Sequence, residues 1–191
     1  MEERKASLRR ALVKVFPQPE KTGDVVCEIG CGHGHFLVAY AHAHPAARCI
    51  GIDIERTRIE RAIRKQERAR ATQLHFLQAD AGLFLDALPA GVMLGRVFIL
   101  FPDPWPKTRH HKNRLIQSKF LDELRRRASS ATRIFFRTDH ELYFEDARTV
   151  FERHAGWQLV DEHWPFEHET VFQSRATSYR SLVARLRTVP P

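Results

Sequence analysis

Residues 25–36 read Val-Val-Cys-Glu-Ile-Gly-Cys-Gly-His-Gly-His-Phe, and this stretch indicates the fold. A short apolar run, 25–29, leads directly into glycines at the alternate positions 30, 32 and 34. Glycine lets the backbone turn tightly and approach a ligand closely, so the stretch predicts a buried strand, a ligand-binding turn and a helix. The spacing differs from the G-x-G-x-x-G pattern that places a pyrophosphate at a helix N-terminus.

The rest of the chain alternates apolar, β-rich runs with charged helical stretches, which is typical of parallel βαβ units. The predicted strands are 25–29, 48–52, 73–77, 96–101 and 133–137, with two weaker strands at 157–162 and 179–186. The predicted helices are 36–43, 55–71, 82–88, 112–128 and 143–154. This order predicts an α/β, doubly wound, mostly parallel seven-stranded sheet, and 191 residues suit a single domain, 1–191.

Composition is that of an ordinary globular protein, with 43% hydrophobic and 28% charged residues. No apolar run approaches the roughly 20 residues that span a bilayer, and the charged N-terminus does not resemble a secretory signal. The odd count of cysteines, Cys27, Cys31 and Cys49, favours a reducing compartment, so we expect a cytoplasmic protein. The net charge of +8 favours a polyanionic partner such as nucleic acid, although a basic surface without such a partner remains open.

Acidic residues end five of the predicted strands: Glu28, Asp53, Asp80, Asp103 and Asp139. Each one alone could cap a helix or a turn. Together they predict an acidic edge where doubly wound folds bind ligands, which suits a cationic, phosphate-free nucleoside cofactor such as S-adenosylmethionine. Asp53 could accept from both ribose hydroxyls and Asp80 from an adenine amine, whereas Glu28 would repel a pyrophosphate.

Residues 101–107 read Phe-Pro-Asp-Pro-Trp-Pro-Lys. Because Phe101, Asp103 and Trp105 each precede a proline, we expect extended backbone at all three and a stiff loop that presents one carboxylate and one indole. The alternative is a rigid surface turn with Trp105 in the core. The basic stretch that follows predicts a phosphate clamp beside a reaction centre; its members are Lys107, Arg109, His110, His111, Lys112 and Arg114.

At these residues the chain resembles the bacterial tRNA (guanine-N7-)-methyltransferases, which are class I S-adenosylmethionine-dependent enzymes. The most specific match is 101–107, followed by Arg109-His110 and Lys112. Thr138-Asp139-His140 and Thr170-Val171-Phe172-Gln173 also fall where the family has motifs.

The resemblance implies a class I methyltransferase (Rossmann-like) fold that methylates N7 of a guanosine in the variable loop of tRNA, with no metal. It implies a monomer or homodimer that contacts tRNA and no membrane. The cofactor-binding residues that it implies are Glu28, Gly30, Gly32, Asp53, Asp80 and Asp103, of which Asp103 is also catalytic. The substrate-binding residues that it implies are Lys107, Asp139, Thr170, Val171, Phe172 and Gln173.

The chain departs from the family pattern at two motif positions and in a short segment before the first strand. Gln173 stands where the family has Glu, and Asn113 interrupts a Lys-Arg-Arg triplet. These departures leave open that the chain is a catalytically silent RNA-binding paralogue. A second alternative is a methyltransferase of the same fold that acts on a small molecule. A zinc site is a further alternative, and its ligands would be Cys27, Cys31, His33 and His35.

Overall fold

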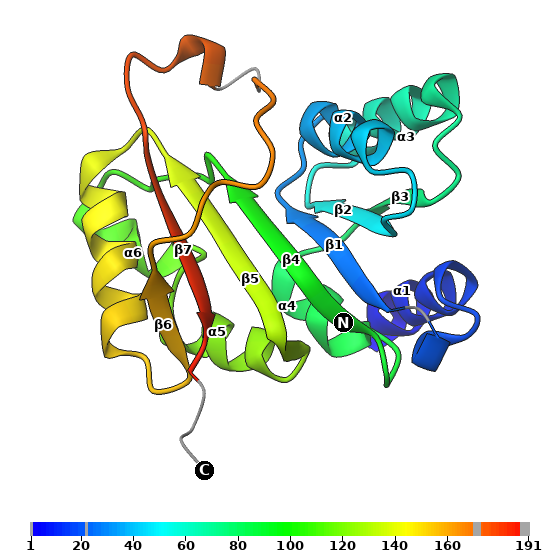
Figure 1. Cartoon of the computed structure of the whole chain (residues 1–191), viewed down its shortest axis with the longest axis horizontal. Coiled ribbons are helices and arrows are strands. Elements are labelled where there is room, and N and C mark those ends of the chain that lie inside the picture. The colour runs from blue at the N-terminus through cyan, green and yellow to red at the C-terminus, as the bar shows by residue number, and fades with distance from the viewer. Residues whose placement is uncertain (1, 22, 170–172, 188–191) are drawn as a thin grey trace.

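The computed structural model describes residues 2–21, 23–169 and 173–187. Its centre is a seven-stranded sheet in the order β3-β2-β1-β4-β5-β7-β6 (Figure 1). The strands are β1 (Asp24–Ile29), β2 (Cys49–Asp53), β3 (Leu74–Gln78), β4 (Met93–Leu100), β5 (Ala128–Thr138), β6 (Trp157–Val160) and β7 (Arg180–Leu186). The first five strands are parallel to their neighbours, and β7 runs antiparallel between β5 and β6. The predicted doubly wound, mostly parallel sheet is therefore confirmed.

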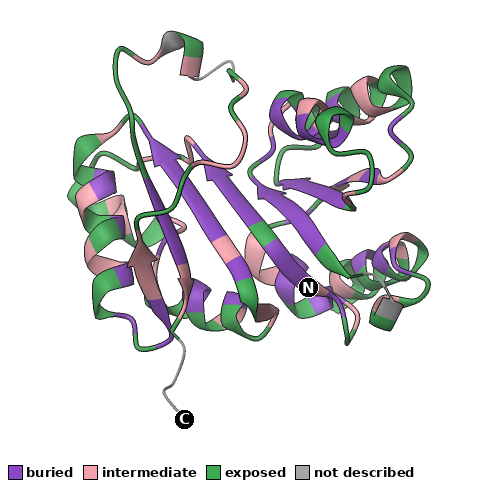
Figure 2. Ribbon diagram, in the orientation of Figure 1, coloured by how far each residue is buried: buried purple, intermediate pink, exposed green. Residues whose placement is uncertain are grey.

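Helices cover both faces of this sheet. They are α1 (Glu2–Val15), α2 (His35–Ala43), α3 (Arg56–Ala69), α4 (Ala81–Ala87), α5 (Ser118–Arg125) and α6 (Glu141–Arg153), with short 3₁₀ turns η1 (Pro19–Lys21), η2 (Thr108–Asn113) and η3 (Gln173–Arg175). One core cluster joins α1, α4, α5 and α6 to one face, and a second joins α2 and α3 to the other. The strands between the two layers are mostly buried (Figure 2). In the described residues, no helix is both long enough and apolar enough to cross a bilayer.

One helix was missed and one helical prediction was wrong. Helix α1 was not predicted, yet it buries Leu8 and Leu12 in the core. The single predicted helix 112–128 is instead η2, a break, α5 and the start of β5. The break has a local cause, because the Gln117 side-chain amide donates to the carbonyls of Lys112 at 2.6 Å and Arg114 at 3.0 Å. These carbonyls would pair with backbone amides in a continuous helix.

The segment between β6 and β7 crosses the face that carries α2 and α3 (Figure 1). The Trp164 ring lies 5.4 Å from that of Phe135 on β5, and the Phe166 ring lies 5.3 Å from that of Tyr40 on α2. These two aromatic side chains thus pack against the core cluster on the α2 and α3 face of the sheet. The segment also reaches the C-terminal edge of the sheet, where ligands bind in such folds.

Candidate active site

The five predicted acidic residues share one edge of the sheet. Glu28 and Asp53 lie within the ends of β1 and β2, whereas Asp80, Asp103 and Asp139 follow β3, β4 and β5. Strands β1 and β4 are neighbours whose following helices lie on opposite faces (Figure 1). In folds of this kind, the ligand-binding crevice lies at the C-terminal ends of the two strands where this reversal occurs. The prediction that these carboxylates gather at one edge is confirmed.

The glycine loop after β1 is left-handed at three positions, with φ of +79° at Gly30, +52° at Gly32 and +72° at Gly34. A Cβ at Gly34 would lie 2.6 Å from the Phe76 ring and 2.9 Å from Ala62, so a side chain is excluded there. At Gly30 and Gly32 a Cβ would meet nothing within 4 Å. The loop therefore packs closely against β3 and α3 on one side and offers bare backbone to a ligand on the other.

Asp53 is 4% exposed and holds the glycine loop in place. Its Oδ2 accepts from the Gly32 amide at 3.0 Å, and its Oδ1 accepts from the Glu55 amide at 2.8 Å. Nη1 of Arg58 lies 3.7 Å from Oδ2. A carboxylate has about four lone-pair sites, so both oxygens keep capacity to accept from a pair of ribose hydroxyls.

Glu28 is a buried acid beside this loop, with 3% of its surface exposed. Its Oε2 has no hydrogen-bond partner among the described residues. Burial, and then the charge of Asp53, raise the pKa of this carboxyl well above its usual range, and a hydrogen bond from the Leu37 amide opposes them. A cationic ligand would reverse the shift, so this acid suits a positively charged cofactor.

Asp80 caps α4, since its Oδ1 accepts from the Leu83 amide at 2.9 Å. The helix-cap interpretation of this residue therefore holds for one oxygen. The residue is exposed at the C-terminal end of β3, and its contact with an adenine amine remains a prediction.

The proline-rich loop after β4 differs from its predicted geometry. The prediction of extended backbone is wrong for Phe101 and Trp105, whose φ angles are +49° and +45°. Left-handed backbone outside glycine costs about 1–3 kcal/mol, which tertiary contacts must offset. At Phe101 the amide donates to the Arg137 carbonyl at 2.7 Å, and the ring meets that of Tyr179 at 5.9 Å. Asp103 is exposed, and Trp105 is 36% exposed rather than placed in the core.

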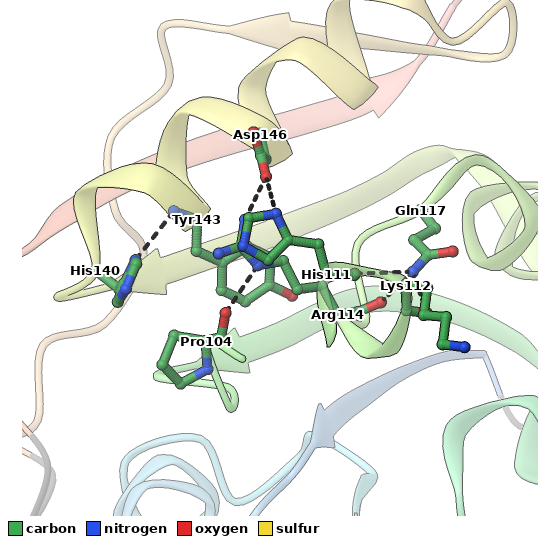
Figure 3. Close-up of polar contacts among 8 residues, drawn as sticks. All are labelled: Pro104, His111, Lys112, Arg114, Gln117, His140, Tyr143 and Asp146. Carbon is green, nitrogen blue, oxygen red and sulfur yellow. Dashed lines mark hydrogen bonds and ion pairs between the residues drawn. The ribbon is translucent and has the colours of Figure 1, made fainter. Parts of the chain in front are cut away.

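The basic stretch after Trp105 divides into exposed and buried cations. Lys107, Arg109 and Lys112 are exposed around η2 and can reach phosphates. Arg114 is buried and pairs with Asp146 on α6 (Figure 3). Its inclusion in the phosphate clamp was therefore wrong, because sequence proximity could not show that its guanidinium points into the protein.

Arg137 on β5 anchors the segment between β6 and β7. Its guanidinium donates twice to Glu167, at 2.8 and 2.9 Å, and lies 4.0 Å from the Trp164 ring centre and 4.6 Å from that of Tyr179. These hydrogen bonds hold the pKa of Glu167 below its usual range. Gln173 joins the cluster, since its Oε1 accepts from Arg137 at 3.4 Å and its Nε2 donates to the Tyr179 hydroxyl at 3.1 Å. The anchor was not predicted, although a charge following Ile-Phe-Phe in a strand is a signal of a buried ion pair.

Substrate contacts were also predicted for Asp139 and for residues 170–172, and they remain predictions. Asp139 is exposed at the end of β5, on the same edge as Asp103. Thr170, Val171 and Phe172 lie outside the described residues.

The residues of the alternative zinc site do not converge. Cys27 is fully buried in the core that faces α4 to α6, and burial raises the pKa of its thiol. Cys31 is buried in the opposite core, and His35 is exposed. No group of three or more metal-ligating side chains is arranged for an ion in residues 2–21, 23–169 and 173–187.

A family model described as "Putative methyltransferase" matches residues 22–188 of the chain. The chain belongs to this methyltransferase family. Its relatives include proteins named tRNA (guanine-N(7)-)-methyltransferase, so the resemblance that the proline-rich loop indicated is confirmed.

Three of these relatives show how far the similarity extends. The protein of Nitrosococcus oceani is 36% identical over 138 residues, which are 72% of this chain and 58% of that protein. The protein of Rubrobacter xylanophilus is 32% identical over 147 residues, or 75% and 66% of the two chains. The protein of Clostridium novyi is 28% identical over 180 residues, or 88% and 83%. The chain thus spans less than two thirds of the length of the first two relatives.

Solved structures identify the fold. TrmN from Thermus thermophilus has a TM-score of 0.62 at 17% identity and covers 94% of this chain, which covers 48% of TrmN. The aminoglycoside resistance methyltransferase NpmB1 has a TM-score of 0.62 at 18% identity, with 94% and 93% covered. The fold is that of the class I methyltransferases, as expected.

Proposed function

We propose that this protein transfers a methyl group from S-adenosylmethionine to N7 of a guanosine in the variable loop of tRNA. The observation that carries the proposal is the loop 101–107. It presents the exposed Asp103 at the crevice between β1 and β4, in a chain whose relatives are named tRNA (guanine-N(7)-)-methyltransferases.

The residues of the crevice fit this cofactor, which supplies a methyl group on a cationic sulfonium. Asp53 would accept from the ribose hydroxyls with its remaining lone pairs, and Gly30 and Gly32 would let the ligand contact their backbone. The buried, unpartnered Oε2 of Glu28 would face the positive charge of the ligand. Asp80 would accept from the adenine amine with the oxygen that does not cap α4.

The chemistry requires no general base. Guanine N7 has an available lone pair and no proton, so transfer moves a positive charge onto the base and reduces catalysis to positioning and electrostatics. A carboxylate about 4 Å from a unit positive charge contributes on the order of 4 kcal/mol at an intermediate effective dielectric. Asp103 would take this role, and Asp139 on the neighbouring strand end would accept from the amino edge of the guanine.

The surface beside the crevice suits RNA. Lys107, Arg109 and Lys112 would contact phosphates, and the segment 170–173 would contact the substrate nucleoside. The target guanine would have to turn out of the folded tRNA to reach the crevice. We also propose that residues 1–191 form a single domain that acts in the cytoplasm as a monomer or homodimer.

The test is methyl transfer from labelled S-adenosylmethionine to two tRNAs, one undermethylated and one carrying 7-deazaguanine at the target position. The deaza base keeps the shape and the Watson–Crick edge but has carbon in place of N7. We expect label in the first tRNA and none in the second, with similar binding of both. Transfer to the deaza tRNA at a normal rate would contradict the N7 assignment, and binding without transfer to either would indicate the silent paralogue.

A further inference from the structure

A buried cation connects the loop of Asp103 to helix α6. The side chain of Arg114 is 3% exposed, and its Nε donates to the Pro104 carbonyl at 2.8 Å. Its Nη1 forms an ion pair with Asp146, and its guanidinium lies 4.9 Å from the ring centre of Tyr143 (Figure 3). Both of these partners belong to α6.

The hydrogen bond from Arg114 to the Pro104 carbonyl lies at a strained position of the loop. This carbonyl belongs to the peptide that enters Trp105, whose φ of +45° is left-handed. A hydrogen bond from a charged donor is roughly twice as strong as one between neutral groups. Arg114 therefore holds the peptide between Pro104 and Trp105 in place. Without this bond, the left-handed backbone at Trp105 could relax to a conformation that L-residues prefer.

Through its ion pair with Asp146, the guanidinium also connects to α6, the helix that follows Asp139 at the end of β5. Helix α6 begins two residues after Asp139, and its N-cap His140 accepts through Nδ1 from the Tyr143 amide at 3.2 Å. The Tyr143 hydroxyl accepts in turn from the Ile116 amide at 3.2 Å, and burial raises the pKa of this phenol to about 12. One turn further along the helix, Asp146 pairs with Arg114.

We propose that Arg114 is a positioning residue that sets the Asp103 loop relative to Asp139. This inference rests on the proposed function, because both carboxylates act on the guanine there. The role needs a planar group with donors in two directions, one toward the Pro104 carbonyl and one toward Asp146. A lysine at this position would keep the charge but could not reproduce both contacts in that geometry.

The test compares Arg114→Lys with Arg127→Lys. Arg127 is a matched control, because its guanidinium also donates to backbone carbonyls, at 3.0 Å to Leu85 and 2.8 Å to Leu88, and is part-buried. For Arg114→Lys we expect the single-turnover methylation rate to fall at least about tenfold, or about 1.4 kcal/mol. The dissociation constants of S-adenosylmethionine and tRNA should stay within about twofold of wild type, since the side chain of Arg114 is buried and Asp103 would act chiefly on the charge that develops during transfer. Arg127→Lys should keep the wild-type rate.

A second variant, Arg114→Ala, tests whether misfolding explains a lower methylation rate. Added guanidinium ion should restore part of its methylation rate, whereas sodium at equal ionic strength should not. A methylation rate of Arg114→Lys equal to that of wild type would overturn the inference. The inference would also be overturned if Arg114→Lys lost rate, affinity for S-adenosylmethionine, affinity for tRNA and melting temperature in parallel. A wild-type protein that transfers no methyl group to tRNA would overturn the proposed function, and the inference with it.

Discussion

Glu28 shows at the residue scale how the proposed cofactor site and a stable fold make opposite demands on one carboxyl group. Burial and the charge of Asp53 raise the pKa of its carboxyl in the folded protein, whereas the unfolded chain has the ordinary value. A group with a raised folded-state pKa stabilises the fold below its unfolded pKa and loses that contribution as the pH rises through the folded one. The acid that suits a cationic ligand thus destabilises the free protein at higher pH.

We expect Glu28→Gln to have a larger free energy of unfolding than wild type above the folded pKa of Glu28, because glutamine does not ionise. The same variant should bind S-adenosylmethionine more weakly. In wild type a cationic ligand lowers the pKa of Glu28, so binding should release a proton and strengthen as the pH rises. Urea denaturation across pH and calorimetry in two buffers measure these effects, with the exposed Glu67→Gln as control. Equal stability of Glu28→Gln and wild type at every pH would contradict the assignment.

At the scale of elements, α1 shows how an amphipathic segment can look unstructured in a charged sequence. Its apolar residues Leu8 and Leu12 are one turn apart, and Phe16 follows one turn later. All three are buried, at 7%, 0% and 2% exposure, and the helix packs against α4. Lys5 adds an ion pair to Asp86 on α4 at 2.5 Å. The charges lie on the outer face of a helix that contributes to the core.

This packing predicts that Leu12→Ala lowers the free energy of unfolding by about 2–5 kcal/mol, as for other large-to-small core changes. Val13 is the matched control, because it is the next residue of α1 and is 53% exposed. Val13→Ala should stay within about 0.5 kcal/mol of wild type. Urea denaturation of both variants gives the comparison, and equal costs would show that α1 is not anchored through Leu12.

At the scale of the whole molecule, the structure shows where part of the net charge of +8 lies. The exposed cations of the proline-rich loop and η2 follow β4, at the edge of the sheet where the five acids lie. In the proposed function, an acidic site next to a basic surface would separate the two ligands, because the first would bind a cationic cofactor and the second a polyanion. The cation that the sequence could not assign, Arg114, belongs to the interior instead.

We expect tRNA affinity to fall steeply with salt, and Lys107→Ala with Lys112→Ala to flatten the log–log slope. Each lost phosphate contact should reduce the slope by roughly 0.7–0.9. The control is Arg9→Ala with Arg10→Ala, which removes the same charge from exposed positions of α1, beside the start of β1 (Figure 1). Filter binding at several salt concentrations measures both slopes. If both double variants lose slope equally, the effect reflects net charge rather than a phosphate contact.

The sequence by itself determined the seven strands, the glycine loop and the gathering of acids at one edge. These features are local, since apolar runs, glycine spacing and the parallel βαβ order specify where each strand ends. Only the tertiary structure decided that Phe101 and Trp105 are left-handed, that Arg114 and Arg137 are buried, and that helix 112–128 is broken. The reason is physical: a pre-proline backbone preference or a cation's solvation is worth a few kcal/mol, and contacts from residues distant in sequence can outweigh it.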